Sequence, residues 1–157
     1  MPLLPLIKNL SRQSGSMLLE GLIAILIFSM GILALVGMQA ASIKNTSDAK
    51  SRADASYLAN QIIGQIWADR PNIASYSNYP SGIPCNPTGA ASTNANVVAW
   101  IGSVSQPGTV LGSLPGAAAA KQQIIIGANN VVTVSVCWQA PQETTPHNFV
   151  ATAQIQG

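Results

Sequence analysis

Few side chains in this sequence can take part in acid–base, nucleophilic or metal chemistry. Beyond Pro71 the ionisable residues are Tyr76, Tyr79, Cys85, Lys121, Cys137, Glu143 and His147. General acid–base catalysis calls for a titratable group held beside its substrate, often with a second carboxylate, and a zinc site calls for several His, Cys or Asp/Glu ligands at suitable spacing. The sequence offers neither pattern. We therefore expect no catalytic residues, no metal and no cofactor, and we place His147 and Glu143 in a solvated loop.

Glu20 is the carboxylate that most needs an explanation. No charged residue occurs from Gly21 to Ile43, and a run of roughly 20 apolar residues can cross a bilayer as a helix. A charged side chain inside such a helix costs about 2.5–3.5 kcal/mol on insertion scales, so it has a partner or serves a function. Nothing nearby in the chain offers that partner.

The apolar run has three possible identities. Lys8 and Arg12 supply the basic start of a secretory signal, and residues 38–42 resemble a cleavage site, but the run exceeds the roughly 7–15 residues of a signal's apolar region. An uncleaved membrane anchor fits the length better, although Lys44, Lys50 and Arg52 nearly balance the basic residues before the run. Neither identity accounts for Glu20. The third identity, a leader that is cut off ahead of the apolar helix, does account for it.

The order Gly15, Ser16, Met17, Leu18, Leu19, Glu20, followed by an apolar helix, resembles the class III signal of type IV pilins and type II secretion pseudopilins. The resemblance implies that a prepilin peptidase cuts between Gly15 and Ser16 and N-methylates Ser16, which stands where the family most often has phenylalanine. Glu20 then pairs with the N-terminal amine of a neighbouring subunit. Because desolvation offsets the attraction in a buried ion pair, we interpret this pairing as setting register more than adding stability.

Two longer stretches, "GSMLLEGLIAILIFSMGILALVGMQ" and "YLANQIIGQIWADRPN", resemble the PilV family of minor pilins, also called type IV pilus modification proteins, from residue 12 to about 71. The resemblance implies a low-abundance structural subunit that helps to initiate or modify pilus assembly. Its implied partners are the prepilin peptidase, other minor pilins, the major pilin, an inner-membrane assembly platform and an assembly ATPase. It implies a single-pass inner-membrane protein with a periplasmic head, which later enters the pilus fibre at the cell surface.

Other functions stay open beside this one. The nearest alternative is a minor pseudopilin of a type II secretion system, whose N-terminal segment is very similar. A fibre-borne adhesin could use the polar segment 80–96, which is otherwise a flexible loop. A DNA-uptake role is not expected, because cations dominate DNA binding and Lys121 is the only Lys or Arg beyond Arg70. The formal net charge of +2 likewise gives no reason to expect a nucleic-acid partner.

The chain is expected to contain one long helix, from Met17 to Ala68. After a leader at 1–15, residues 16–44 form its transmembrane or fibre-core part, and residues 45–70 form an amphipathic part. The apolar stripe of that second part consists of Ala55, Leu58, Ala59, Ile62, Ile63, Ile66 and Trp67. The helix should end before Pro71, because the residue preceding a proline avoids helical geometry.

A globular head is expected over residues 71–157. Turn-forming residues dominate a loop region at 71–116, where a short helix near 96–104 is favoured over a strand. An antiparallel sheet at 121–156 contains three strands, at 122–126, 131–138 and 148–155. Its inward faces, expected to pack on the apolar stripe, are Val132, Val134, Val136 and Trp138, and Phe149, Ala151, Ala153 and Ile155. The chain is thus predicted to be α+β, in agreement with the pilin fold that the resemblance implies.

Two cysteines, Cys85 and Cys137, form an even pair in an expected export context. A disulfide between them would pin the loop region across the sheet, and closing a loop of about fifty residues contributes roughly 4 kcal/mol in the chain-entropy model. The alternative is two buried free thiols.

Overall fold

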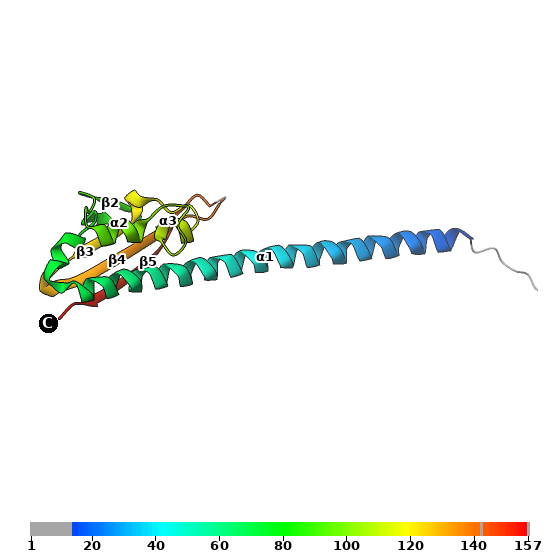
Figure 1. Cartoon of the computed structure of the whole chain (residues 1–157). Coiled ribbons are helices and arrows are strands. Elements are labelled where there is room, and N and C mark those ends of the chain that lie inside the picture. Colours follow the sequence, from blue (N-terminus) through cyan, green and yellow to red (C-terminus); the bar gives the residue numbers. More distant parts are fainter. Residues whose placement is uncertain (1–13, 142, 157) are drawn as a thin grey trace, which may run out of the picture. The chain divides into compact units, whose positions relative to one another are not determined.

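A computed structural model of the chain describes residues 14–141 and 143–156. The chain divides into two compact units, Met1–Asn45 and Thr46–Gly157, and helix α1 (Ser14–Ala68) contributes to both. The second unit adds helices α2 (Ala95–Ile101) and α3 (Val110–Ser113), a hairpin of β1 (Ser81–Ile83) and β2 (Asn86–Thr88), and a sheet of β3 (Gln123–Ile126), β4 (Val131–Trp138) and β5 (His147–Gln154) (Figure 1). Short 3₁₀ turns lie at Arg70–Tyr76, Ala119–Lys121 and Ala128–Asn130. The α+β class is confirmed, while most of the leader, residues 1–13, lies outside the described residues.

Helix α1 changes character along its length. From Ser16 to Ser47 every side chain is exposed, and this part includes an apolar stretch long enough to cross a membrane. From Ser51 onward the helix buries one face. It ends at Ala68, and Pro71 then occupies the first turn of the following 3₁₀ segment, as the avoidance of helical geometry before a proline predicts.

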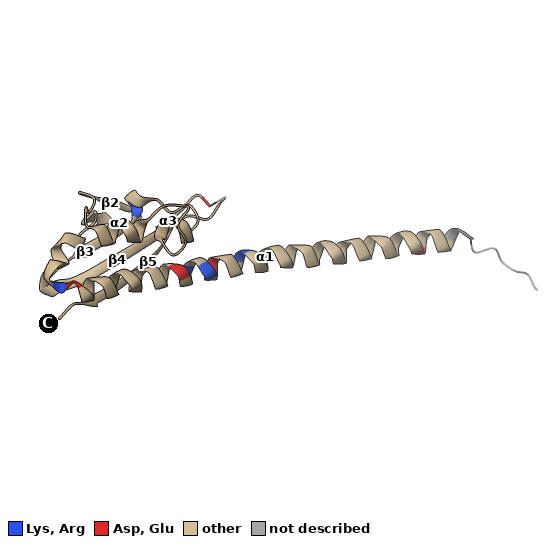
Figure 2. Cartoon of the chain, in the orientation of Figure 1, with Lys and Arg blue, Asp and Glu red and all other residues tan. Residues whose placement is uncertain are grey.

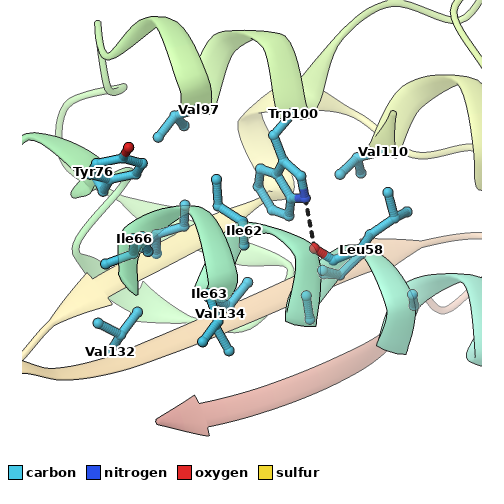
Figure 3. Close-up of a cluster of buried hydrophobic side chains, with 14 of the residues drawn as sticks. Leu58, Ile62, Ile63, Ile66, Tyr76, Val97, Trp100, Val110, Val132 and Val134 are labelled. Atoms are coloured by element: carbon cyan, nitrogen blue, oxygen red, sulfur yellow. Dashed lines mark hydrogen bonds between the residues drawn. The ribbon is translucent and has the colours of Figure 1, made fainter. Parts of the chain in front are cut away.

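The core of the second unit lies between the buried face of α1 and the three-stranded sheet. Leu58, Ile62 and Ile66 pack with Val132 and Val134 of β4, and all five are at most 1% exposed (Figure 3). The predicted packing of the stripe on the sheet is confirmed for these residues.

Two tryptophans near this core behave differently. Trp100 of α2 is buried, and its indole Nε1–H donates to the Leu58 carbonyl at 2.9 Å (Figure 3). Trp67, by contrast, is 41% exposed, so its assignment to the stripe is wrong. It follows Ile66 by one residue, and a step of about 100° around the helix turns it away from the core. The Arg70 guanidinium lies 5.9 Å from its ring centre.

The sheet is antiparallel, with β4 between β3 and β5. The register pairs Ile124 with Val134 on one side and Val134 with Ala151 on the other. The β3–β4 turn places Asn129 and Asn130 at positive φ, which asparagine tolerates better than most residues. The three predicted strands are therefore confirmed, with bounds that differ by one residue at β3 and β5.

The region 71–116 was expected to be mainly loop with one short helix, and most of its residues do lie outside α-helices and β-strands. It contains the β1–β2 hairpin, α2 and α3. The predicted short helix is α2, whose N-cap is Asn94: the Asn94 side chain accepts hydrogen bonds from the backbone N–H groups of Asn96 and Val97. Gly102, at φ 64°, ends the helix, so Val104 lies beyond it and is 79% exposed.

Candidate functional site

Glu20 lies on the exposed surface of the apolar part of α1. Its neighbours Leu19, Leu22 and Ile23 are more than half exposed. In Figure 2 a long stretch of α1 carries no charged residue, and the sequence places that stretch between Glu20 and Lys44. In the described part of the chain, no hydrogen bond or ion pair reaches the Glu20 carboxylate.

The predicted processing site lies at the start of the same helix. Because α1 begins at Ser14, the peptide bond between Gly15 and Ser16 is in its first turn. Ser16 and Glu20 are four residues apart, which places them about 6 Å apart along the axis, on the same side of the helix. An N-terminal amine at Ser16 would thus lie about one turn from the carboxylate of its own chain.

Three glycines, Gly21, Gly31 and Gly37, occur in this part of α1. A Cβ built on each would meet nothing within 4 Å apart from its chain neighbours and the nearby backbone of α1 itself. Each glycine lowers the stability of an isolated helix by about 1 kcal/mol relative to alanine, but small residues let the backbones of membrane helices approach closely. The apolar part of α1 therefore has room for contact with other helices at these positions.

The disulfide between Cys85 and Cys137 is confirmed, with an S–S distance of 2.10 Å and a Cα–Cα distance of 5.5 Å. Cys85 lies in the turn of the β1–β2 hairpin at φ 65°, and Cys137 is fully buried on β4. Gly82 in the same hairpin has φ 86°, and an added Cβ would come within 2.8 Å of the Asn86 carbonyl oxygen. The disulfide thus fixes a tightly turned hairpin to the central strand.

Glu143 lies in the β4–β5 loop as expected but is largely shielded from solvent, and His147, expected in the loop, belongs to a strand. His147 is the first residue of β5, and its ring stacks on Trp138 with centroids 5.7 Å apart. Its Nε2 contacts the Glu143 carboxylate, whose side chain is only 18% exposed. Stacking and carboxylate–imidazole attraction together hold the β4–β5 connection. The four-residue spacing of Glu143 and His147 was visible in the sequence, but the stacking of Trp138 on His147 was not.

A cleft of about 320 Å³ adjoins this pair and is lined by Asp48, Ala49, Arg52, Trp138 and His147. The lining contains no hydroxyl or thiol that a carboxylate–histidine pair could activate as a nucleophile. Within residues 14–141 and 143–156, no group of three or more His, Cys, Asp or Glu side chains is arranged to hold a metal ion.

Several buried polar side chains of the second unit escaped the sequence reasoning. Gln122 is fully buried: its Nε2 donates to the Cys137 carbonyl, and its Oε1 accepts from the Cys137 N–H, both at 2.9 Å. Tyr76 is also fully buried, donating to Asp69 and accepting from the Asn96 amide, and burial raises the pKa of its hydroxyl. Both side chains have hydrogen-bond partners within the fold, which indicates a structural role.

Comparison of the chain with known protein families, curated proteins and solved structures found no match. Function is therefore inferred from the residues and their geometry.

Proposed function

We propose that this chain is a minor subunit of a type IV pilus, a structural protein that helps to initiate or modify assembly of the fibre. The observation that supports this most is the isolated Glu20 carboxylate, four residues after Ser16, on an exposed apolar helix. That arrangement suits a chain whose helix enters a bundle of like helices, where a charge must be matched by a neighbour.

In this proposal a prepilin peptidase cuts between Gly15 and Ser16 and N-methylates the new terminus. The ammonium group at Ser16 of one subunit meets the Glu20 carboxylate of another. Because Ser16 and Glu20 are about one helical turn apart, the contact requires a stagger of about one turn, or 5.4 Å, between neighbouring helices. Pairing neutralises both charges, whereas a subunit without Glu20 leaves the ammonium alone in an apolar surrounding.

The second unit forms the head that the fibre carries. Its disulfide suits the oxidising periplasm, where the head resides while α1 anchors the chain in the inner membrane. The partners proposed are the peptidase, the major pilin, other minor pilins and the inner-membrane assembly platform. The chain acts by binding these partners and not by catalysis.

The experiment that tests this proposal is the intact mass and N-terminal sequence of the membrane-bound protein, from cells with and without prepilin peptidase. We expect a peptidase-dependent start at methylated Ser16. A start after Ala40 or Ala41 would identify an ordinary exported domain and overturn the proposal.

Deletion of the gene separates the pilus from the secretion pseudopilus. We expect fewer or no surface pili. Normal pili together with loss of protein secretion would assign the subunit to a type II secretion system.

A further inference from the structure

The two edges of the three-stranded sheet differ. Along β3, the edge is covered by residues 78–81. The backbone of Asn78 exchanges two hydrogen bonds with Ile124, at 3.0 and 2.9 Å, and the side-chain amide of Gln123 donates to the carbonyls of Tyr79 and Ser81. This edge has little capacity left to bind another strand.

The β5 edge is open. In the ladder, the Ile155 N–H donates to the Asn130 carbonyl, which shows that the odd-numbered residues of β5 form the hydrogen-bonded pairs with β4. The even-numbered residues, Asn148, Val150, Thr152 and Gln154, therefore direct their backbone N–H and C=O groups away from β4. No hydrogen bond from another described segment reaches these backbone groups.

The apolar side chains of the core are also incompletely buried along this edge. Val132, Val134 and Val136 of β4 are fully buried, whereas their partners on β5, Ala153, Ala151 and Phe149, are only half-buried. A further strand beside β5 would cover these three side chains and bind the free backbone groups at the same time.

Natural proteins usually protect an edge strand with charged side chains, proline, a bulge or a short length. β5 has eight residues in unbroken register, contains no proline, and carries no Lys, Arg, Asp or Glu. Charged and titratable groups lie near its two ends: His147, the first residue of β5, contacts Glu143 and lines a cleft with Asp48 and Arg52, and the Arg70 guanidinium donates to the Gln156 carbonyl at 2.9 Å.

We propose that the β5 edge binds an extended segment of a different protein subunit, which adds a fourth strand to the sheet. The recognised segment alternates small apolar residues over Phe149, Ala151 and Ala153 with neutral polar residues on the other face. An acidic residue at the end near Gln156 would complement Arg70. The identification of the neighbour as a fibre subunit rests on the proposed function. The capacity of the β5 edge to bind a further strand does not.

The direction of β5 favours a different subunit over a second copy of this chain. One cleft brings His147 beside Asp48 and Arg52, and another brings Ile155 beside Ala68 and Arg70, so β5 runs in the same direction as the second half of α1. Two copies joined through antiparallel β5 strands would have these helical segments running in opposite directions. A strand from a different subunit is under no such constraint, because it can run along β5 in either direction.

The test places a photo-cross-linking amino acid at Asn148 of the full chain in its native host, with Val98, an exposed residue of α2, as the control position. We expect Asn148, and not Val98, to cross-link to one other fibre subunit within an extended segment. Val150→Pro should abolish the cross-link, because proline removes an outward N–H without breaking the β4–β5 ladder. Val150→Thr, which keeps the N–H and the branched shape, should retain it.

Amide hydrogen exchange on the unmodified chain gives a second test that needs no variant. The amides of Val150 and Thr152 should exchange rapidly in the detergent-solubilised chain and at least about tenfold more slowly in purified fibres. The inference would be overturned by equal exchange in both states or by cross-linking at Asn148 no stronger than at Val98. Cross-linking of Asn148 to a second copy of this chain would also overturn it.

These results are separable from the proposed function. A chain found in fibres with an unprotected β5 edge would refute strand addition alone. A chain absent from fibres, but cross-linked through Asn148 to a strand of another exported protein in a Val150→Pro-sensitive manner, would refute the fibre role and support strand addition.

Discussion

Reducing the disulfide between Cys85 and Cys137 should destabilise the second unit by an amount that its loop length sets. The sequence separation is 52 residues. In the chain-entropy model, a loop of this size restricts the unfolded chain by about 14 cal/mol/K, which corresponds to about 4 kcal/mol at 25 °C. With a urea dependence of about 2 kcal/mol/M, the unfolding midpoint should fall by about 2 M.

The assay is urea unfolding of the full chain in detergent, oxidised and reduced, followed by tryptophan fluorescence. Trp100 reports on the core because it is 3% exposed and bonded to Leu58. The control is the double variant Cys85→Ala/Cys137→Ala, whose midpoint should lie near that of the reduced chain and should not respond to reductant. A shift below about 0.5 M with an unchanged slope would refute the loop-entropy reasoning, since it corresponds to only about 1 kcal/mol.

Three further predictions concern single side chains. Burial raises the pKa of Tyr76, so above pH 10 the unfolded state loses the proton first and the unfolding free energy falls; Tyr76→Phe should flatten that decline in pH-dependent denaturation curves, and an unchanged decline would contradict it. Ile62→Ala should cost about 2–5 kcal/mol in urea unfolding, because Ile62 is fully buried between α1 and the sheet; a loss below 1 kcal/mol would show that the site collapses around the gap. Glu20→Ala should leave cleavage after Gly15 mostly intact but block incorporation into fibres, measured by immunoblotting of sheared pili, and normal incorporation would exclude pairing between neighbours.

The parts of the fold that could be predicted are those with a local or periodic signal. Alternating apolar residues identified β4 and β5, and Pro71 located the end of α1. The disulfide could be anticipated from two cysteines in an expected export setting. Glu20 could be singled out because one carboxylate beside an uncharged run of this length is conspicuous.

The parts that could not be predicted depend on contacts between distant residues. β1 and β2 have three residues each and include Gly82 and Pro87, so they show no alternation. Their position depends on the Cys85 disulfide and on the bonds of Gln123 to the neighbouring carbonyls. Likewise, Gln122 appears as an ordinary polar residue until the fold places its amide against the Cys137 backbone.

The covered β3 edge limits how far the sheet can be extended. Strand addition can propagate through many subunits only if each one offers both a donor edge and an acceptor edge. Asn78 and Gln123 occupy the β3 side, so among the described residues the three-stranded sheet has one available edge, along β5. This sheet can pair with one other sheet through β5, but it has no second edge to which a third sheet could bind. That limit would protect the head from uncontrolled polymerisation through its sheet, and it suits a subunit that ends a series of contacts.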